Sequence, residues 1–401
     1  MRTPSTRRAQ YAVAVLAVAA VLLAGCGGRG DDDDDDQGGR SGEVVVTVDP
    51  ADDNANVAVP EGQFFSDSSP WNQRIDTSKT EPSSDRMIEY AHFRVGVYED
   101  PDGGTTLTRQ LRIDEGLFIN TVRWTVPVVS GGEPTSLVCR QLVCGDGLNT
   151  TVLNIPDDVD PDPRYDGWYT VFDTSSSTAY DLWRARRESD DTISYNYMRK
   201  WDLDGPGYSQ PYNEGARGSG LPLFAGLIRP GELVSGEITH ALAISLPGPA
   251  QGTFVQPASS TDGNGRAGSI PEGARIRLKR DVVLPAPIDP RTGKPIKLTK
   301  QQQRLADAIV ACLRTYGAIV VDRAAVPTLY AQRDVTASLL TGNELQGLRL
   351  GDFEVLPLGQ RYRYPPDGDS IAELDDLSGD PSSSPSRGPS ESPSVTGGAV
   401  Q

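Results

Sequence analysis

The chain has 401 residues, 42 glycines, 31 prolines and a formal net charge of −17. Much of the negative charge lies in two polar end segments. The remaining central region carries an ordinary acidic surface, which excludes nucleic acid and anionic lipid as its expected partners. We expect residues 44–365 to form a single β-rich domain between these segments.

The chain begins with the pattern of a lipoprotein signal peptide, residues 1–25. A basic start precedes the apolar residues 11–23, and the sequence Leu-Ala-Gly-Cys ends at Cys26. The apolar stretch is shorter than the about 20 residues that a membrane-spanning helix needs. Its last residues resemble a lipobox, whose cysteine receives a diacylglyceryl group. We predict a lipid at Cys26 that anchors the chain to the extracytoplasmic face of the cell membrane; an ordinary secreted protein is the alternative.

Two segments that flank the predicted domain lack periodic apolar residues. Residues 26–43 contain the run Asp31–Asp36, and residues 366–401 are rich in proline, serine and glycine. Such segments bury too little apolar surface to offset the entropy lost on ordering, so we expect both to be disordered. For the aspartate run we favour a self-repelling spacer over a cation trap.

Alternating apolar and polar residues predict a series of short strands separated by turns. The pattern indicates a mainly β fold, and more specifically an antiparallel β-sandwich of jelly-roll type. No repeat of fixed length is evident, which disfavours a propeller or a solenoid. The predicted strands cover residues 93–97, 122–126, 167–173, 179–187, 193–201, 237–246, 274–279, 318–323 and 328–331.

The strand predicted at 237–246 has two different faces. One face carries small residues and the other carries bulky ones, because successive side chains of a strand point to opposite sides. The bulky set is Ile238, His240, Leu242, Ile244 and Leu246.

One amphipathic helix is predicted near residues 300–316. Thr299 and Gln302 form a capping box, apolar residues follow at spacings of three and four, and Gly317 ends the helix. We expect it to cover a sheet edge or face, in preference to binding a partner.

The remaining three cysteines indicate no metal site. Cys139 and Cys144 are close enough to form a disulfide in an exported protein, with a pair of free thiols as the alternative. Two cysteines without nearby histidines predict no metal, and we expect no cofactor. Cys312 lies on the apolar face of the predicted helix and is expected to be buried.

Six motifs occur in order between residues 64 and 357. Together they resemble a family of large, secreted or lipid-anchored, β-rich bacterial proteins that is uncharacterised, so the resemblance implies no activity. Members have the sequence Trp-Pro-Ala-Arg-His after the histidine strand, whereas this chain has Gln256–Ser260 and lacks that histidine. The motifs are FSDSSPWN, DGW with DLW, GSGLPLFAGLIRPGEL, ITHAL, GARIRLK and LRTYG.

The chain has two histidines, His92 and His240. We favour a core role for His240, bonded to a carboxylate or carbonyl, over a role as general base. His92 begins an exposed-looking strand and is the weaker candidate. No serine nucleophile elbow, histidine metal pair, phosphate loop or nucleotide fingerprint is present.

Carboxylates are too numerous for a catalytic pair to be chosen from sequence. Two of Asp166, Asp181, Glu232 and Glu237 facing each other across a groove would suit acid and base catalysis on a glycoside, although each alone is more often structural. Asp158, Asp160 and Asp162 alternate as in calcium loops. Two prolines interrupt them, and the sixth position of an EF-hand loop, which needs glycine, is Pro163, so we favour no metal there; a calcium site of another geometry is the alternative.

Two hypotheses for function follow. We favour a cell-surface lipoprotein that binds, or has a structural role toward, an extracellular or wall glycan or another surface protein. The alternative is an extracytoplasmic carbohydrate-active enzyme, a polysaccharide lyase or a glycoside hydrolase. In that case a groove would contain the stacking residues Trp168, Tyr180 and Trp183 and the catalytic candidates His240, Asp181, Glu232 and Arg184.

Overall fold

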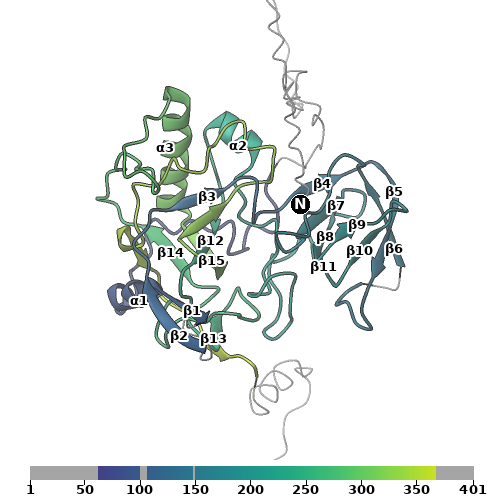
Figure 1. Cartoon of the computed structure of the whole chain (residues 1–401), viewed down its shortest axis with the longest axis horizontal. Helices are drawn as coiled ribbons and strands as arrows, with labels where there is room; N and C mark the ends of the chain where they lie inside the picture. Colours follow the sequence, from purple (N-terminus) through teal and green to yellow (C-terminus); the bar gives the residue numbers. More distant parts are fainter. Residues whose placement is uncertain (1–61, 100–105, 148–149, 367–401) are drawn as a thin grey trace, which may run out of the picture. The chain divides into compact units, whose positions relative to one another are not determined.

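The computed structural model describes residues 62–99, 106–147 and 150–366 (Figure 1). The predicted signal peptide, Cys26, the acidic segment and the tail from residue 367 lie outside these ranges. Strands far outnumber helices in the described part, so the predicted mainly β class is confirmed. No helix among the described residues is long and apolar enough to cross a membrane.

A six-stranded mixed sheet forms one part of the fold. Its central strand β12 is buried at all five positions, because apolar residues cover both of its faces. Leu242, Ile244 and Leu246 pack into one core and Ala243 into another, so the predicted division between bulky and small faces is confirmed for this strand. In sheet order the strands are β17 (Phe353–Val355), β14 (Arg275–Leu278), β15 (Ala318–Arg323), β12 (Leu242–Leu246), β16 (Thr328–Tyr330) and β3 (Phe118–Asn120).

The predicted helix covers this sheet. Helix α3 (Lys300–Thr315) begins with the capping box of Thr299 and Gln302, in which each side chain bonds the other residue's backbone N–H. Its apolar residues, including Ile309 and Leu313, are buried in the same core as the bulky face of β12. The helix contacts β14, beside which it is drawn in Figure 1. Helices α1 (Ser84–Ala91), α2 (Pro230–Ser235) and η1 (Leu350–Asp352) are short and were not predicted.

Two four-stranded sheets form a sandwich around a separate core. This core contains Leu137, Ile155, Tyr169 and Ile193, which come from both sheets, as expected for facing layers. One sheet has the order β11 (Tyr197–Asp202), β8 (Thr178–Trp183), β7 (Tyr169–Asp173) and β4 (Val128–Ser130). The other has the order β6 (Thr150–Ile155), β5 (Glu133–Cys139), β10 (Ile193–Tyr195) and β9 (Arg186–Arg187).

The sheets are not purely antiparallel. Within the described residues, four pairings are parallel: β5 with β10, β4 with β7, β12 with β15, and β3 with β16. Two small antiparallel pairs complete the fold, β1 (Phe93–Glu99) with β2 (Thr106–Arg112) and β13 (Thr253–Val255) with β18 (Arg361–Arg363).

Four predicted strands differ from the structure. Residues 179–187 divide after Trp183 into β8 and β9, which belong to different sheets. Residues 121–125 are bends rather than a strand, and Trp124 has a left-handed backbone and an exposed side chain. Residues 193–201 divide at Asn196 into β10 and β11, which belong to different sheets. Residues 237–241 are not strand, so His240 lies just before β12. Alternation alone does not make a strand, because a strand also needs a neighbour to pair with.

Candidate functional site

His240, Glu232 and Arg229 form a hydrogen-bonded cluster at a surface pocket. Glu232 lies in the first turn of α2, and its Oε1 accepts from His240 Nε2 at 2.8 Å and from Arg229 Nε at 3.0 Å. Its Oε2 accepts from the backbone N–H of Arg229 at 2.9 Å. His240 Nδ1 lies 2.9 Å from the carbonyl oxygen of Ala241. Two of the catalytic candidates, His240 and Glu232, are therefore in contact.

Hydrogen bonds and nearby charges set the ionisation of Glu232. Both ring nitrogens of His240 lie at hydrogen-bond distance from oxygen atoms, the carbonyl of Ala241 and the carboxylate of Glu232. Burial acts to raise the pKa of Glu232, but the charges and hydrogen bonds of His240 and Arg229 outweigh it and lower the pKa to about 2. Glu232 is consequently held as a carboxylate between Arg229 and the ring of His240, and both ring nitrogens of His240 lie against protein oxygens.

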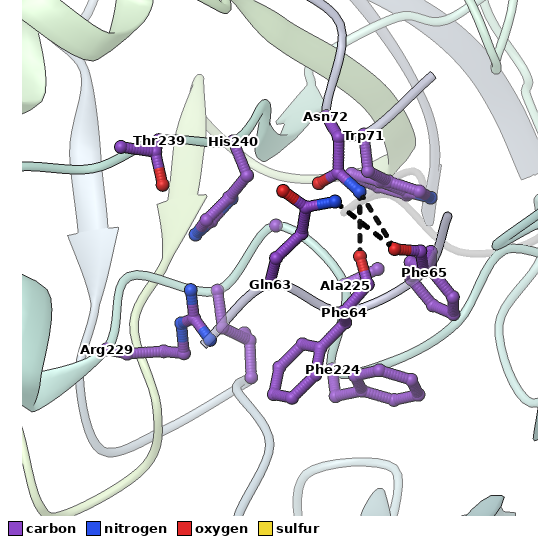
Figure 2. A pocket seen from close by; sticks show the side chains of 12 residues that line it. Gln63, Phe64, Phe65, Trp71, Asn72, Phe224, Ala225, Arg229, Thr239 and His240 are labelled. Carbon is purple, nitrogen blue, oxygen red and sulfur yellow. Dashed lines mark hydrogen bonds between the residues drawn. The ribbon is translucent and has the colours of Figure 1, made fainter. Parts of the chain in front are cut away.

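The pocket beside this cluster is a small hollow that is partly open to solvent. Figure 2 shows His240, Arg229 and Gln63 converging on it. The amide nitrogens of Gln63 and Asn72 donate to protein oxygens, Gln63 to Asp67 at 2.8 Å and Asn72 to the carbonyl of Phe64 at 2.9 Å. No donor among the described residues reaches the amide oxygens of Gln63 and Asn72. The lining consists of Gln63, Phe64, Phe65, Trp71, Asn72, Phe224, Ala225, Gly226, Leu227, Arg229, Thr239 and His240.

Local backbone geometry holds the pocket wall in place. Gly226 has a φ of +73°, and a Cβ there would lie 2.4 Å from the backbone nitrogen of Ala243 and 2.7 Å from the Trp71 ring. Only glycine fits this position. Trp71 is itself fixed, because its indole N–H donates to the Gly207 carbonyl at 2.9 Å and its own carbonyl accepts from Ala241.

Asp181, another catalytic candidate, lies in a different environment. It is fully buried, and its two oxygens accept from Thr170 Oγ1 at 2.6 Å, Trp201 Nε1 at 2.8 Å and the backbone N–H of Leu223 at 2.7 Å. Burial raises the pKa of Asp181 to about 6, although the three hydrogen bonds act to lower it. Because it joins β7, β8 and β11 to the segment at Leu223 and does not line the pocket, Asp181 is an internal anchor and not an acid facing His240.

The other candidates do not form one stacking surface. Trp168 is buried, and its indole N–H donates to the Ala216 carbonyl at 3.1 Å. Tyr180 and Trp183 are three residues apart in β8, so they lie on opposite faces of the sheet. Arg184 is exposed, and its guanidinium lies 5.1 Å from the Trp183 ring centre. None of these four residues lines the pocket.

The three cysteines among the described residues are a disulfide pair and one buried thiol. Cys139 and Cys144 form a disulfide across a loop whose tip exposes Leu142 and Val143. Cys312 is free and buried, and burial raises the pKa of its thiol.

Two of the three aspartates with calcium-like spacing make separate ion pairs. Asp160 pairs with Arg187 and Asp162 pairs with Arg164.

Of the other two carboxylate candidates, Glu237 is exposed, and burial raises the pKa of Asp166. His92 is buried, and its Nδ1 lies 2.6 Å from the Ile113 carbonyl.

A second cluster of functional groups was missed by the sequence analysis. One carboxylate oxygen each of Asp262, Glu272 and Asp322 lies within 4.8 Å of the others. Burial and the charge of Asp262 raise the pKa of Asp322 to about 7. Burial, followed by the charges of Asp262 and Asp322, raises the pKa of Glu272 well above its usual value. No spacing signal connects these residues, because the fold brings them together from separate segments.

No protein-family model, curated protein or solved structure matches the chain. The family resemblance noted above therefore stays a prediction, and the function has to be argued from the geometry of the two sites.

Proposed function

We propose that the chain is a non-catalytic, lipid-anchored protein of the extracytoplasmic face of the cell membrane that binds a wall or extracellular glycan in the pocket beside His240. The observation that carries this proposal is the full use of the His240 and Glu232 side chains within the protein. A general base needs a free lone pair and a general acid needs a proton with a pKa near the working pH. At this pocket both ring nitrogens of His240 lie against protein oxygens, and the pKa of Glu232 is about 2.

The free polar atoms of the pocket suit a hydroxyl-rich ligand. Gln63 and Asn72 use their N–H groups on protein carbonyl and carboxylate oxygens, which leaves their amide oxygens as acceptors. Thr239 adds an exposed hydroxyl at the rim. Sugar hydroxyls donate to such oxygens, and the half-buried Phe64 ring supplies an apolar wall.

The experiment is a binding assay of the purified chain with a panel of wall and matrix polysaccharides. Gln63→Ala and Thr239→Ala each remove a pocket group without touching the Glu232 cluster. We expect each to weaken binding about five- to tenfold, the loss of one hydrogen bond. Gln141→Ala, an exposed glutamine in the disulfide loop, is the matched control and should bind normally. Equal binding by all four proteins, or binding by none, would refute a glycan site at this pocket.

One observation favours the enzymatic alternative at a different place. Asp322 and Glu272 have strongly raised pKa values, a property common among catalytic acids. The same assay should therefore include detection of new reducing ends and unsaturated uronates, with His240→Ala and Asp322→Asn. Turnover that survives in His240→Ala but not in a folded Asp322→Asn would support an enzyme. Binding without turnover supports the binding protein.

A further inference from the structure

Asp262, Glu272 and Asp322 are held together by rigid backbone. Asp322 lies in β15, and the segment with Glu272 is fixed against β13 and β15. The backbone N–H of Val255 donates to the Glu272 carbonyl at 3.0 Å, and that of Gly273 donates to the Val320 carbonyl at 2.8 Å. Gly273 has a φ of +85°, and a Cβ there would lie 1.7 Å from the Val255 oxygen. The carboxylates of Glu272 and Asp322 are therefore preorganised by the backbone pairing of their segments.

The charges of Arg217 and Arg323 offset only part of the negative charge of this cluster. Asp262 is partly exposed and pairs with Arg323 at 2.8 Å. Glu272 and Asp322 are buried, and the ion pairs of the described residues include neither of them. Buried carboxylates are stable only when they are paired, protonated or bound to a metal ion.

Glu272 also has a buried oxygen without a partner. Its Oε2 accepts from the backbone N–H of Asp262 at 3.3 Å, whereas Oε1 has no hydrogen-bond partner among the described residues. An unsatisfied buried acceptor costs about 1–3 kcal/mol, more when it is charged. An electropositive occupant between the carboxylates would remove this cost.

The ligands of the cluster favour calcium. Three carboxylate oxygens within 4.8 Å of one another can reach one calcium ion, which binds oxygen at about 2.3–2.6 Å in flexible geometry. Magnesium requires a near-octahedral arrangement and keeps several of its waters, so one or two carboxylates usually hold it. The absence of cysteine or histidine from the cluster disfavours softer metals.

We propose that Asp262, Glu272 and Asp322 bind one calcium ion. The ion would neutralise the buried carboxylates and fix the segment of residues 262–273 to β15. Water and further oxygens would complete its coordination, since calcium takes about six to eight ligands. The site is separate from the pocket beside His240, so its test does not depend on the proposed glycan binding.

The test is calorimetric titration of the full purified chain with calcium chloride after removal of divalent ions, together with thermal unfolding. We expect one saturable site per chain, a rise in the unfolding temperature with calcium, and at least tenfold weaker binding of magnesium. Glu272→Gln and Asp322→Asn keep the side-chain volume and should weaken calcium binding at least tenfold.

Two controls separate this site from other acids of the chain. Glu344 is a buried glutamate whose oxygens accept from Thr341 and Gly342, so Glu344→Gln should leave calcium affinity unchanged. Replacement of Asp31–Asp36 by serine should also leave the single tight site in place. The proposal is overturned if the wild type shows no saturable site at millimolar calcium. It is equally overturned if both Glu272→Gln and Asp322→Asn retain wild-type affinity, or if the serine replacement abolishes binding.

Discussion

The pocket beside His240 and the acidic cluster each contain a glutamate, Glu232 and Glu272, and the pKa values of these two side chains shift in opposite directions. Glu232 contacts His240 and Arg229, and their charges and hydrogen bonds lower its pKa to about 2. Glu272 is also buried but lies beside two acids, and its pKa rises well above the usual value. The partners of a carboxyl group, and not its burial alone, therefore decide whether it is a fixed anion or a group that needs a counter-charge.

Asp181 lies between these extremes. It is as buried as Glu272, but its partners are three neutral donors, and its pKa is raised only to about 6. The three sites form a series from His240 and Arg229 through neutral donors to acidic neighbours. The predictions below test this series.

The largest effect is expected for Asp181→Ala. Removal of the carboxylate leaves buried donors on Thr170, Trp201 and Leu223 without an acceptor, and each such donor costs about 1–3 kcal/mol. We expect a loss of about 3–5 kcal/mol in the free energy of unfolding measured with urea. The control Asp202→Ala, at an exposed position of β11, should cost less than about 1 kcal/mol. A similar cost for both variants would contradict the anchoring role.

The next effect concerns the pH dependence of Glu232. Its folded-state pKa of about 2 lies below its ordinary value of 4.5, so its stabilising effect is complete above that value and is lost as the pH falls toward 2. Glu232→Gln should cost about 2 kcal/mol of unfolding free energy at pH 7 and much less at pH 3. Urea unfolding of both proteins at the two pH values measures this. A difference that stays constant with pH would contradict an ionised Glu232.

Glu272→Gln should have the opposite sign. Without divalent ions a neutral amide avoids placing a charge beside two acids, so the variant should match or exceed the wild type by up to about 1 kcal/mol. Urea unfolding in the presence of a chelator measures this. Destabilisation by more than about 1 kcal/mol would mean that the carboxylate is balanced by a group other than a cation.

The smallest effect is expected for Asp162→Asn. Arg164 lowers the pKa of Asp162 to about 2, as at Glu232, but the Arg164 side chain is 77% exposed. Solvent screens such a pair, so the variant should cost less than about 0.5 kcal/mol, and less still at high salt. A cost near that of Glu232→Gln would show that the pKa alone predicts the energy.

Sequence reasoning identified the features whose signals are local. The capping box and apolar spacing of α3, the strand at 318–323 and the two faces of β12 depend on neighbouring residues and appear as predicted. The segment around Trp124 alternates like a strand but has no partner strand, and pairing is a long-range property. The contact of His240 with Glu232 could have been predicted from the sequence, because the two residues are only eight positions apart. The cluster of Asp262, Glu272 and Asp322 could not have been predicted, because its members come from different segments that only the fold brings together.

Cys312 gives the pocket an internal reporter. Cys312 lies on the buried face of α3, and its Sγ donates to the His240 carbonyl at 3.1 Å. A thiol reagent can reach it only after α3 separates from the segment that carries His240. The rate at which a reagent labels the Cys312 thiol therefore measures local opening of α3 beneath the pocket. A ligand in the pocket that held α3 and the His240 segment together would slow this labelling.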